Sequence, residues 1–221
     1  MIQFIKNENF INGANELIKQ LKLELIKNPV LWIISGGSNI QIEKYILEHL
    51  DKKYLSNLEI ILADERFVPP NDPNSNYNQL IKAGLKQDNL NFETILSNLN
   101  LAKTKETYLS LLEKKLSRCL IVIGQFGIGV DGHTLGILPF SETINSTDKI
   151  VCYTGKDFTR LSLSLNFIKK RINYGYIFCF GKDKKTALSI LNSDNNDINH
   201  YPSLIFQQIK GIKLYNEYIG G

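Results

Sequence analysis

Val30-Leu31-Trp32-Ile33-Ile34 is a continuous apolar run that leads directly into the turn Ser35-Gly36-Gly37-Ser38-Asn39. A run of this kind is typical of a strand that is covered on both faces, as in a parallel sheet. After the turn, apolar residues recur at helical spacing, at Ile42, Tyr45, Ile46 and Leu50. The segment therefore predicts a strand, a glycine turn and a helix, which together form one unit of an α/β fold.

The same alternation is predicted along the rest of the chain. The predicted helices cover 14–26, 108–116 and 184–191, and the further predicted strands cover 58–63, 120–123 and 174–180. Asn28-Pro29 is expected to end the first helix, and two polar segments, 68–78 and 192–197, are expected to be surface loops. We predict an α/β fold in which residues 1–221 form a single domain, with a mostly parallel, Rossmann-like sheet and helices on both of its faces.

Composition limits the classes of function. The 221 residues carry a formal charge of +4, from 26 basic and 22 acidic residues that are interleaved along the chain. The absence of a basic block argues against a nucleic-acid partner. No segment approaches the roughly 18 apolar residues of a membrane span, and the N-terminus lacks the pattern of a secretory signal. A cytoplasmic protein with neither a nucleic-acid nor a membrane partner is expected.

The chain has three cysteines, Cys119, Cys152 and Cys179, and each lies in an apolar run. Their spacing does not match that of a metal site. Free cysteine commonly behaves as a small hydrophobic residue, so we expect three buried, reduced thiols.

A second glycine-rich turn, Gly127-Ile128-Gly129-Val130-Asp131-Gly132-His133-Thr134, follows an apolar strand. Ligands of parallel α/β proteins bind at the carboxyl ends of strands. Asp131 can orient His133, and histidine is the side chain best suited to exchange protons near neutral pH. We predict that His133 is a general base; the alternative is that it caps a following helix. His49 and His200 are expected to be structural.

A charged turn, Ala63-Asp64-Glu65-Arg66-Phe67-Val68-Pro69-Pro70, also begins where an apolar strand ends, and Ser75-Asn76-Tyr77 follows it. Two such turns suggest one shared cleft. The backbone N–H groups of Gly36, Gly37 and Ser38 at a helix start suit a phosphate, because the helix dipole and the unpaired donors both favour an anion. The alternative is a tight turn that binds nothing.

With these segments in place, the sequence resembles the 6-phosphogluconolactonase family, within a larger group that includes glucosamine-6-phosphate deaminases. The resemblance extends over most of the chain. It is carried by Ser35–Ser38, by Asp64–Arg66 with Val68-Pro69 and Ser75–Tyr77, by Gly127–His133 with Leu138-Pro139, and by Arg160–Leu163, Gly181–Lys184 and Pro202-Ser203. It implies hydrolysis of 6-phosphoglucono-1,5-lactone to 6-phosphogluconate, in the oxidative pentose phosphate pathway, without a metal, a cofactor or a covalent nucleophile.

The resemblance also implies roles for individual residues. His133 would be the base, Asp131 would hold its tautomer, and Arg66 would stabilise the oxyanion or grip sugar hydroxyls. Asp64 and Asn76 would shape the sugar site. The implied phosphate ligands are Gly36, Gly37, Ser38, Arg160 and Lys184, with Lys182 or Lys185 as replacements for Lys184.

The sequence departs from the family pattern at two places. Asn39-Ile40 stands where the family usually has Thr-Pro, and we expect Asn39 to cap the helix instead. Gly136 stands where the lactonases usually carry a serine, which is expected to reshape the pocket wall.

Two other functions are weighed against the lactonase. One is a deaminase and isomerase of an amino-sugar phosphate, but Ile137-Leu138-Pro139 lacks the carboxylate that ring opening would use, and Arg66 stands where those enzymes usually have tyrosine. The other is a non-catalytic sugar-phosphate sensor, which would bind without turnover. The expected partner is a small phosphosugar lactone, with its ring size open, and the expected state is a monomer.

Overall fold

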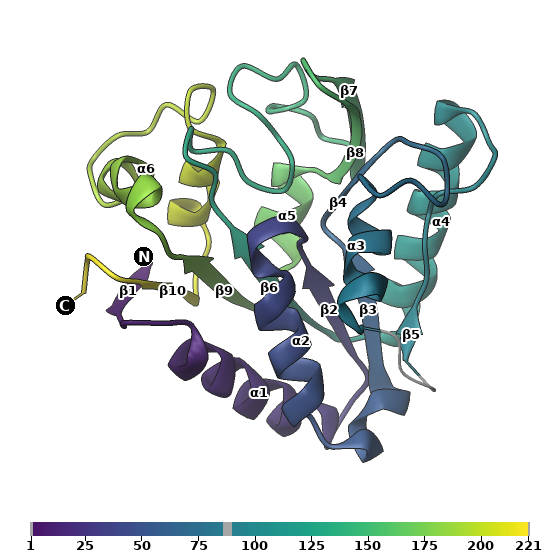
Figure 1. Ribbon diagram of the computed structural model, residues 1–221, viewed down its shortest axis with the longest axis horizontal. Helices are drawn as coiled ribbons and strands as arrows, with labels where there is room; N and C mark the ends of the chain where they lie inside the picture. Colours follow the sequence, from purple (N-terminus) through teal and green to yellow (C-terminus); the bar gives the residue numbers. More distant parts are fainter. Residues whose placement is uncertain (1, 86–89, 221) are drawn as a thin grey trace.

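The computed structural model describes residues 2–85 and 90–220, and its central element is a seven-stranded sheet (Figure 1). The strand order is β1-β10-β9-β6-β2-β3-β5, and every neighbouring pair is parallel. The strands are β1 (Gln3–Lys6), β2 (Val30–Ile34), β3 (Leu58–Leu62), β5 (Asn91–Phe92), β6 (Ile121–Gly127), β9 (Tyr174–Cys179) and β10 (Ile212–Asn216). The predicted parallel α/β sheet is confirmed.

Helices cover both faces of this sheet. They are α1 (Ile11–Leu25), α2 (Ile40–His49), α3 (Asn76–Ala83), α4 (Leu101–Arg118), α5 (Leu165–Arg171) and α6 (Lys185–Leu191). The face with α1 and α2 is turned toward the viewer in Figure 1. Buried residues of α1 and α2 form one apolar cluster, and those of α4, α5 and α6 belong to another.

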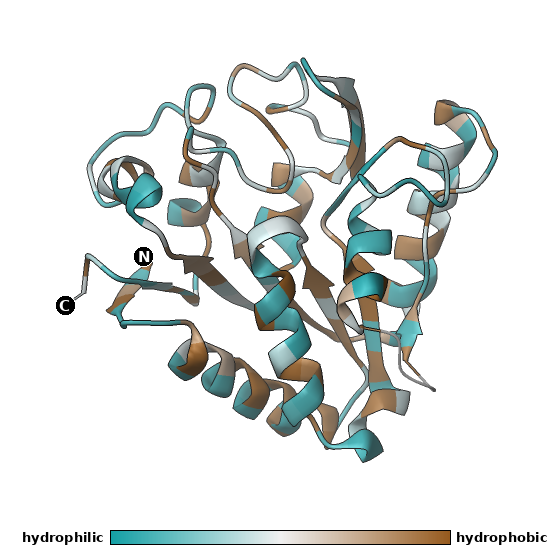
Figure 2. Cartoon of the chain, in the orientation of Figure 1, coloured by the Kyte–Doolittle hydropathy of each residue, from teal (hydrophilic) through white to brown (hydrophobic). Residues whose placement is uncertain are grey.

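The apolar run of β2 follows from this two-sided packing. Leu31 and Ile33 point into the cluster of α4, α5 and α6, whereas Val30, Trp32 and Ile34 point into the cluster of α1 and α2. All five residues are buried, and Figure 2 shows β2 hydrophobic along its length while α1 alternates. The unbroken run is therefore required by burial on both faces.

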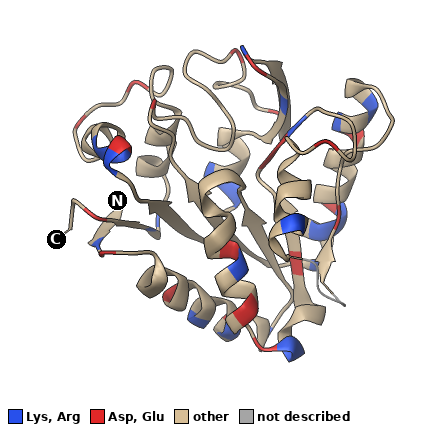
Figure 3. Ribbon diagram, in the orientation of Figure 1, with Lys and Arg blue, Asp and Glu red and all other residues tan. Residues whose placement is uncertain are grey.

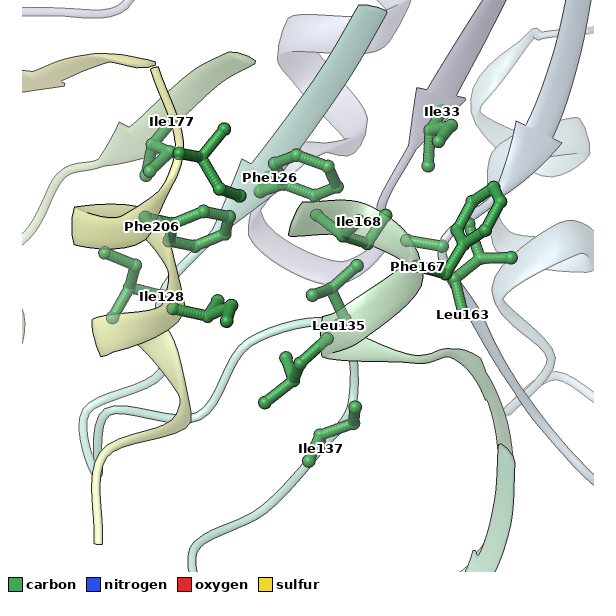
Figure 4. Packing of buried hydrophobic residues seen from close by; sticks show 14 of the residues in the cluster. Ile33, Phe126, Ile128, Leu135, Ile137, Leu163, Phe167, Ile168, Ile177 and Phe206 are labelled. Atoms are coloured by element: carbon green, nitrogen blue, oxygen red, sulfur yellow. The ribbon is translucent and has the colours of Figure 1, made fainter. Parts of the chain in front are cut away.

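The apolar cluster that contains residues of α4, α5 and α6 also includes side chains from a loop (Figure 4). Phe126 of β6 stacks on Phe206, with ring centroids 5.3 Å apart, and Leu135 and Ile137 from the segment after β6 are buried in the same cluster. Burial of these two side chains fixes the loop that carries them against the sheet.

A smaller antiparallel sheet lies beside the main one and was not predicted. Its order is β4-β8-β7, formed by β4 (Asp64–Arg66), β8 (Thr159–Leu163) and β7 (Ile150–Thr154). Arg66 pairs with Arg160 across β4 and β8. This pairing brings two segments that are far apart in the sequence to the same edge of the fold.

Two expectations about local structure are wrong. The loop expected over 68–78 ends early, because α3 begins at Asn76. Ser75 caps α3 by accepting from the N–H of Asn78 at 3.1 Å, and a buried carboxylate of β4 accepts from the N–H of Asn76.

The other wrong expectation concerns the cysteines. Cys152 is only half-buried, whereas Cys119 and Cys179 are buried; all three are free. The segment 192–197 is largely exposed, as predicted.

Charged residues are distributed over the outer surfaces of the helices. Figure 3 shows Lys and Arg interleaved with Asp and Glu along these helices. Within residues 2–85 and 90–220, no helix is long and apolar enough to cross a bilayer.

The ion pair of Lys115 with Glu59 is buried. The Lys115 ammonium lies 2.9 Å from a carboxylate oxygen of Glu59 and 2.9 Å from the carbonyl oxygen of Asn91, and its side chain is 1% exposed. Its exposed neighbour Lys114 contacts Glu93 at 3.6 Å. Lys115 also contacts Glu93 at 3.1 Å. Arg118 NH1 lies 2.5 Å from the other oxygen of Glu59, so removal of the buried cation would leave Glu59 with the half-exposed Arg118 as its cationic partner.

We expect Lys115→Met to lower the free energy of unfolding by about 2 kcal/mol, because Glu59 keeps only Arg118 as a cationic partner and the Asn91 carbonyl oxygen loses its donor. Lys114→Met should lower it by less than about 1 kcal/mol, as is usual for an exposed pair. Urea unfolding of both variants tests this. Equal losses would show that the buried pair has no special weight.

Candidate active site at the carboxyl end of the sheet

A cavity of about 490 Å³ lies at the carboxyl ends of β2 and β6 and beside β4. Residues from segments far apart in the sequence line it. All ten predicted site residues are among them: Gly36, Gly37, Ser38, Asp64, Arg66, Asn76, Asp131, His133, Arg160 and Lys184. The structure therefore brings the predicted residues to one place.

His133 and Asp131 form a pair at the rim of this cavity. Asp131 Oδ1 lies 2.6 Å from His133 Nδ1 and also accepts from the His133 backbone N–H at 3.1 Å. The hydrogen bond with His133 is the main cause that lowers the pKa of Asp131 to about 2. Assigned from this contact, the imidazole proton sits on Nδ1, which leaves Nε2 free to accept a proton.

Gly129 allows the ring of His133 to lie where it does. The Gly129 N–H donates to the His133 carbonyl oxygen at 2.8 Å, and a Cβ on Gly129 would lie 2.0 Å from His133 Nδ1. The alternative that His133 caps a following helix is wrong, because the described chain contains no helix between β6 and β7. His49 ends α2 with Nδ1 2.8 Å from the Tyr45 carbonyl oxygen, and His200 stacks on Tyr201; neither histidine lines the cavity.

Glu65 joins β4 to α3 and received no role from the sequence. Its carboxylate accepts from the backbone N–H groups of Arg66, Asn76 and Tyr77 at 2.7–2.9 Å and from the Ser75 hydroxyl at 2.9 Å. Burial raises the pKa of Glu65, and these hydrogen bonds act in the opposite direction. The carboxylate thus fixes the backbone on both sides of the cavity residues Arg66 and Asn76.

Asn76 acts on two neighbours at once. Its Nδ2 donates to the Asp64 carbonyl oxygen at 3.0 Å and to Asp64 Oδ2 at 3.3 Å. A Cβ on Gly36 would lie 2.9 Å from the Asn76 side chain. Burial raises the pKa of Asp64, while His133, Arg160 and Arg66 lower it. Asn76, itself 5% exposed, therefore positions Asp64 beside the turn after β2.

The turn after β2 enters a 3-10 segment, Gly37–Asn39, that continues into α2. The first N–H groups of a helix have no partner inside it and can bind an anion. The expectation that Asn39 caps the helix is wrong. Its backbone is already helical, with φ −86° and ψ −12°, its side chain makes no capping bond, and that side chain is buried instead.

Basic side chains flank this turn unequally. Lys184 lines the cavity, whereas Lys182 and Lys185 do not. Arg160 lines it too, but NH1 and NH2 donate to the carboxylate of Asp157 at 2.8 and 2.9 Å. This contact lowers the pKa of Asp157 to about 2. Asp157, which the sequence did not single out, therefore neutralises much of the charge of Arg160.

Arg66 remains beside the cavity with one backbone contact. Its NH1 donates to the Asn74 carbonyl oxygen at 3.0 Å, and its guanidinium lies 5.0 Å from the centre of the Phe158 ring. The described contacts leave part of the guanidinium fork available to a ligand.

Gly136 forms part of the cavity wall within a tight turn. The Ile137 N–H donates to the Thr134 carbonyl oxygen at 2.8 Å, and the two residues between them have positive φ: +53° at Leu135 and +65° at Gly136. A Cβ at Gly136 would lie 2.4 Å from Asp64 Oδ2. The absence of a side chain here lets the Asp64 carboxylate reach the wall.

Two side chains from the smaller sheet hold this turn. The Ser162 hydroxyl donates to the Leu135 carbonyl oxygen at 2.7 Å, and the Tyr153 hydroxyl donates to the carbonyl oxygen of Gly136. Burial of Leu135 offsets the strain of its left-handed backbone. No pattern in the sequence pointed to Tyr153, because its contact depends on the smaller sheet, which was not predicted.

Comparison with known proteins assigns the fold and its relatives. A model of the family Glucosamine-6-phosphate isomerases/6-phosphogluconolactonase matches residues 6–213. A 6-phosphogluconolactonase of Chlamydia pneumoniae is 25% identical over 206 residues, which cover 90% of this chain and 76% of that protein. A 6-phosphogluconolactonase of Haemophilus influenzae is 26% identical over 202 residues, covering 85% and 84%.

Solved structures agree on the fold. The crystal structure of a 6-phosphogluconolactonase from Shewanella baltica superposes with a TM-score of 0.78, at 18% identity over 98% of this chain and 97% of that one. At this identity the similarity concerns the fold.

We expect Gly136→Ala to destabilise the protein more than Gly84→Ala. Both positions have positive φ, but nothing lies within 4 Å of a Cβ at Gly84. Gly84→Ala should therefore cost about 1 kcal/mol in backbone strain, and Gly136→Ala at least about 1 kcal/mol more because of the clash with Asp64.

Urea unfolding of both variants, each made with and without Asp64→Ala, separates the two costs. Most of the extra cost at Gly136 should disappear when Asp64 is truncated, because only the Asp64 Cβ, 3.0 Å away, then remains close. If it stays the same in both backgrounds, contact with Asp64 is not its cause.

Proposed function

The chain belongs to the family of glucosamine-6-phosphate isomerases and 6-phosphogluconolactonases, and on this basis we propose that it hydrolyses 6-phospho-D-glucono-1,5-lactone to 6-phosphogluconate. The relatives named above as lactonases support this choice. The observation that carries it is the His133–Asp131 pair, at 2.6 Å, in the same cavity as the turn Gly36–Ser38 and Lys184. A base and an anion site in one cavity suit a phosphorylated ester.

The phosphate would bind at the turn after β2. The N–H groups of Gly36, Gly37 and Ser38 would donate to its oxygens, and Lys184 would supply a positive charge beside them. Arg160 would contribute to the extent that the phosphate displaces Asp157 from its fork. Anchoring the phosphate holds the lactone ring so that its carbonyl carbon lies near the base.

His133 would activate water. Nε2 takes a proton from a water molecule as its oxygen attacks the lactone carbonyl carbon, and Asp131 stabilises the imidazolium that forms. Negative charge develops on the carbonyl oxygen, where Arg66 is the candidate donor. The bond from the carbonyl carbon to the ring oxygen then breaks, and the proton on His133 passes to that oxygen as it becomes a hydroxyl.

Asp64 and Asn76 would act on the sugar. The Asp64 carboxylate can accept hydrogen bonds from ring hydroxyls, and Asn76 holds it in place from the side of α3. Gly136 leaves room for this carboxylate at the wall. The segment Ile137-Leu138-Pro139 carries no carboxylate, which a deaminase would need for ring opening.

We expect His133→Gln to lower kcat for 6-phosphogluconolactone by about 10²-fold or more, because the variant cannot accept the proton from water. His49→Gln is the matched control, since His49 is exposed at the end of α2 and does not line the cavity. Rates are measured with fresh lactone at fixed pH and corrected for spontaneous hydrolysis.

A folded His133→Gln variant with the control's rate would remove His133 from the mechanism. Tight binding of the phosphosugar by the unmodified protein, with no turnover above the blank, would instead favour a sensor.

We expect Lys184→Met to raise KM for the lactone roughly tenfold, because a hydrogen bond to a charged group is lost. Lys182→Met and Lys185→Met should leave KM within about twofold, since neither side chain lines the cavity. Steady-state kinetics at low ionic strength compares the three. An equal effect at Lys185 would reassign the phosphate contact.

A further inference from the structure

Three polar side chains are buried directly beneath the turn that begins α2. Glu43 and Gln125 are fully buried, and Asn39 is 1% exposed. They lie on the face of the sheet that packs against α2, among apolar residues such as Ile42 and Ile123. Buried polar groups are expected to have hydrogen-bond partners.

Ser35, the first residue after β2, links two of these residues. Its N–H donates to Glu43 Oε1 at 2.9 Å, and its hydroxyl donates to the Gln125 carbonyl oxygen at 3.1 Å. Ser35 is therefore tied both to α2 and to β6.

Four side-chain atoms of the cluster lack a partner within the described residues. They are Glu43 Oε2, Gln125 Oε1, Gln125 Nε2 and Asn39 Oδ1. Leaving a buried donor or acceptor unpaired typically costs about 1–3 kcal/mol. Because the four atoms belong to one cluster, hydrogen bonds among the three side chains could satisfy them together.

The packing of α2 on β6 brings the three residues that carry these atoms to one interface. A Cβ on Gly124 would meet the ring of Phe126, on the α5 side, so Gln125 and Gly127 face α2. Asn39 Nδ2 lies only 2.6 Å from the position of a Cβ on Gly127. The end of β6 thus lies against the start of α2.

Measured from the contact between Asn39 and Gly127, Glu43 on α2 and Gln125 on β6 lie at similar distances from the cavity. Glu43 is four residues after Asn39, one turn or about 6 Å farther from the cavity along α2. Gln125 is two residues before Gly127, about 7 Å farther along β6. In Figure 1, α2 lies in front of the sheet at β6 and β2. Glu43 and Gln125 therefore face each other across the interface.

We propose that Glu43 carries a proton on Oε2 at neutral pH, and that this proton completes a hydrogen-bond chain from Ser35 through Glu43 and Gln125 to Asn39. In this chain the Ser35 N–H donates to Glu43 Oε1, the Glu43 Oε2–H donates to Gln125 Oε1, and the Gln125 Nε2–H donates to Asn39 Oδ1. One proton and two added contacts satisfy all four unpaired atoms.

A charged Glu43 would satisfy fewer of them. A carboxylate only accepts hydrogen bonds, so even if both hydrogens of Gln125 Nε2 were donated, to Glu43 and to Asn39, Gln125 Oε1 would remain without a donor. Burial raises the pKa of Glu43 well above its usual range, the charge of Asp64 adds to this, and the Ser35 N–H works against it. The neutral acid is thus favoured by both the hydrogen bonds and the burial.

The proposed hydrogen-bond chain holds both ends of the segment proposed to bind phosphate. Ser35 precedes Gly36, and Asn39 follows Ser38, so the two ends of the turn are fastened to one buried network. A neutral Glu43 also avoids placing a negative charge beneath an anion. Glu43 is therefore a positioning residue for the turn; this part of the inference rests on the proposed function.

Infrared spectroscopy tests the protonation state without any assay of activity. The C=O stretch of a protonated carboxyl group should be present in the unmodified protein at neutral pH in D₂O and should be lost in Glu43→Gln. Glu48→Gln, on the exposed side of α2, is the control and should change only carboxylate bands. Loss of a carboxylate band in Glu43→Gln would overturn the proposal.

Binding measurements test the positioning role. Glu43→Leu should weaken the affinity for inorganic phosphate, measured by calorimetry, and raise KM about tenfold with kcat within about twofold, because the turn loses its support. Glu43→Gln should restore both, since its amide donates to Gln125 and its oxygen accepts from Ser35 as the neutral acid does. A Gln variant as defective as the Leu variant would overturn the proposal.

A double substitution covers the case in which Glu43→Leu does not fold. Glu43→Leu with Gln125→Leu removes the facing polar groups together, so its melting temperature should exceed that of either single variant. Additive losses would overturn the pairing. If the protein shows no lactonase activity, the infrared experiment still tests whether Glu43 is protonated, and the melting experiment still tests its pairing with Gln125.

Discussion

The geometry of the cavity depends on the carboxylate of Glu65. Three backbone N–H groups and one hydroxyl converge on it, and they come from β4 itself and from the start of α3. This carboxylate therefore sets the position of Arg66 relative to Asn76, because its Oε1 accepts from the backbone N–H groups of both residues. Through Asn76 the constraint extends to Asp64 and to the turn after β2. A buried acid that does not itself line the cavity thus organises residues that do.

Three further buried ionisable groups, Lys115, Arg160 and Glu43, are accommodated in three different ways. Away from the cavity, Lys115 pairs with Glu59, and Glu93 and Arg118 complete this cluster of charges. Arg160 is buried but shares its charge with the half-exposed Asp157 at the rim. Glu43 has no cationic partner within the described contacts, which is why a proton is the natural means of neutralising it. Each solution fits its position, because the cost of a charge rises with depth.

The sequence predicted those features that depend on local pattern. The strand β2, its turn and the pairing of Asp131 with His133 follow from apolar runs, glycines and short spacing, and the structure contains all of them. Features that depend on contacts between distant segments were missed. The smaller sheet pairs β4 with β8, almost a hundred residues away, and the start of α3 depends on Glu65. Asn39 was predicted as a cap because its type favours caps, but its backbone is already helical. The same limit explains why Asp157, Tyr153 and Glu43 received no role.

The pairing of Arg160 with Asp157 has a consequence for selectivity among anions. A free anion that approaches this guanidinium must first compete with a carboxylate that is already held at short range by the same chain. Small ions of the surroundings gain little from that exchange, because their other contacts are few. For the phosphosugar ligand proposed above, contacts at several further points would offset the cost of moving this carboxylate into solvent. Asp157 would then favour anions with several anchoring groups over small free ions, whatever their charge.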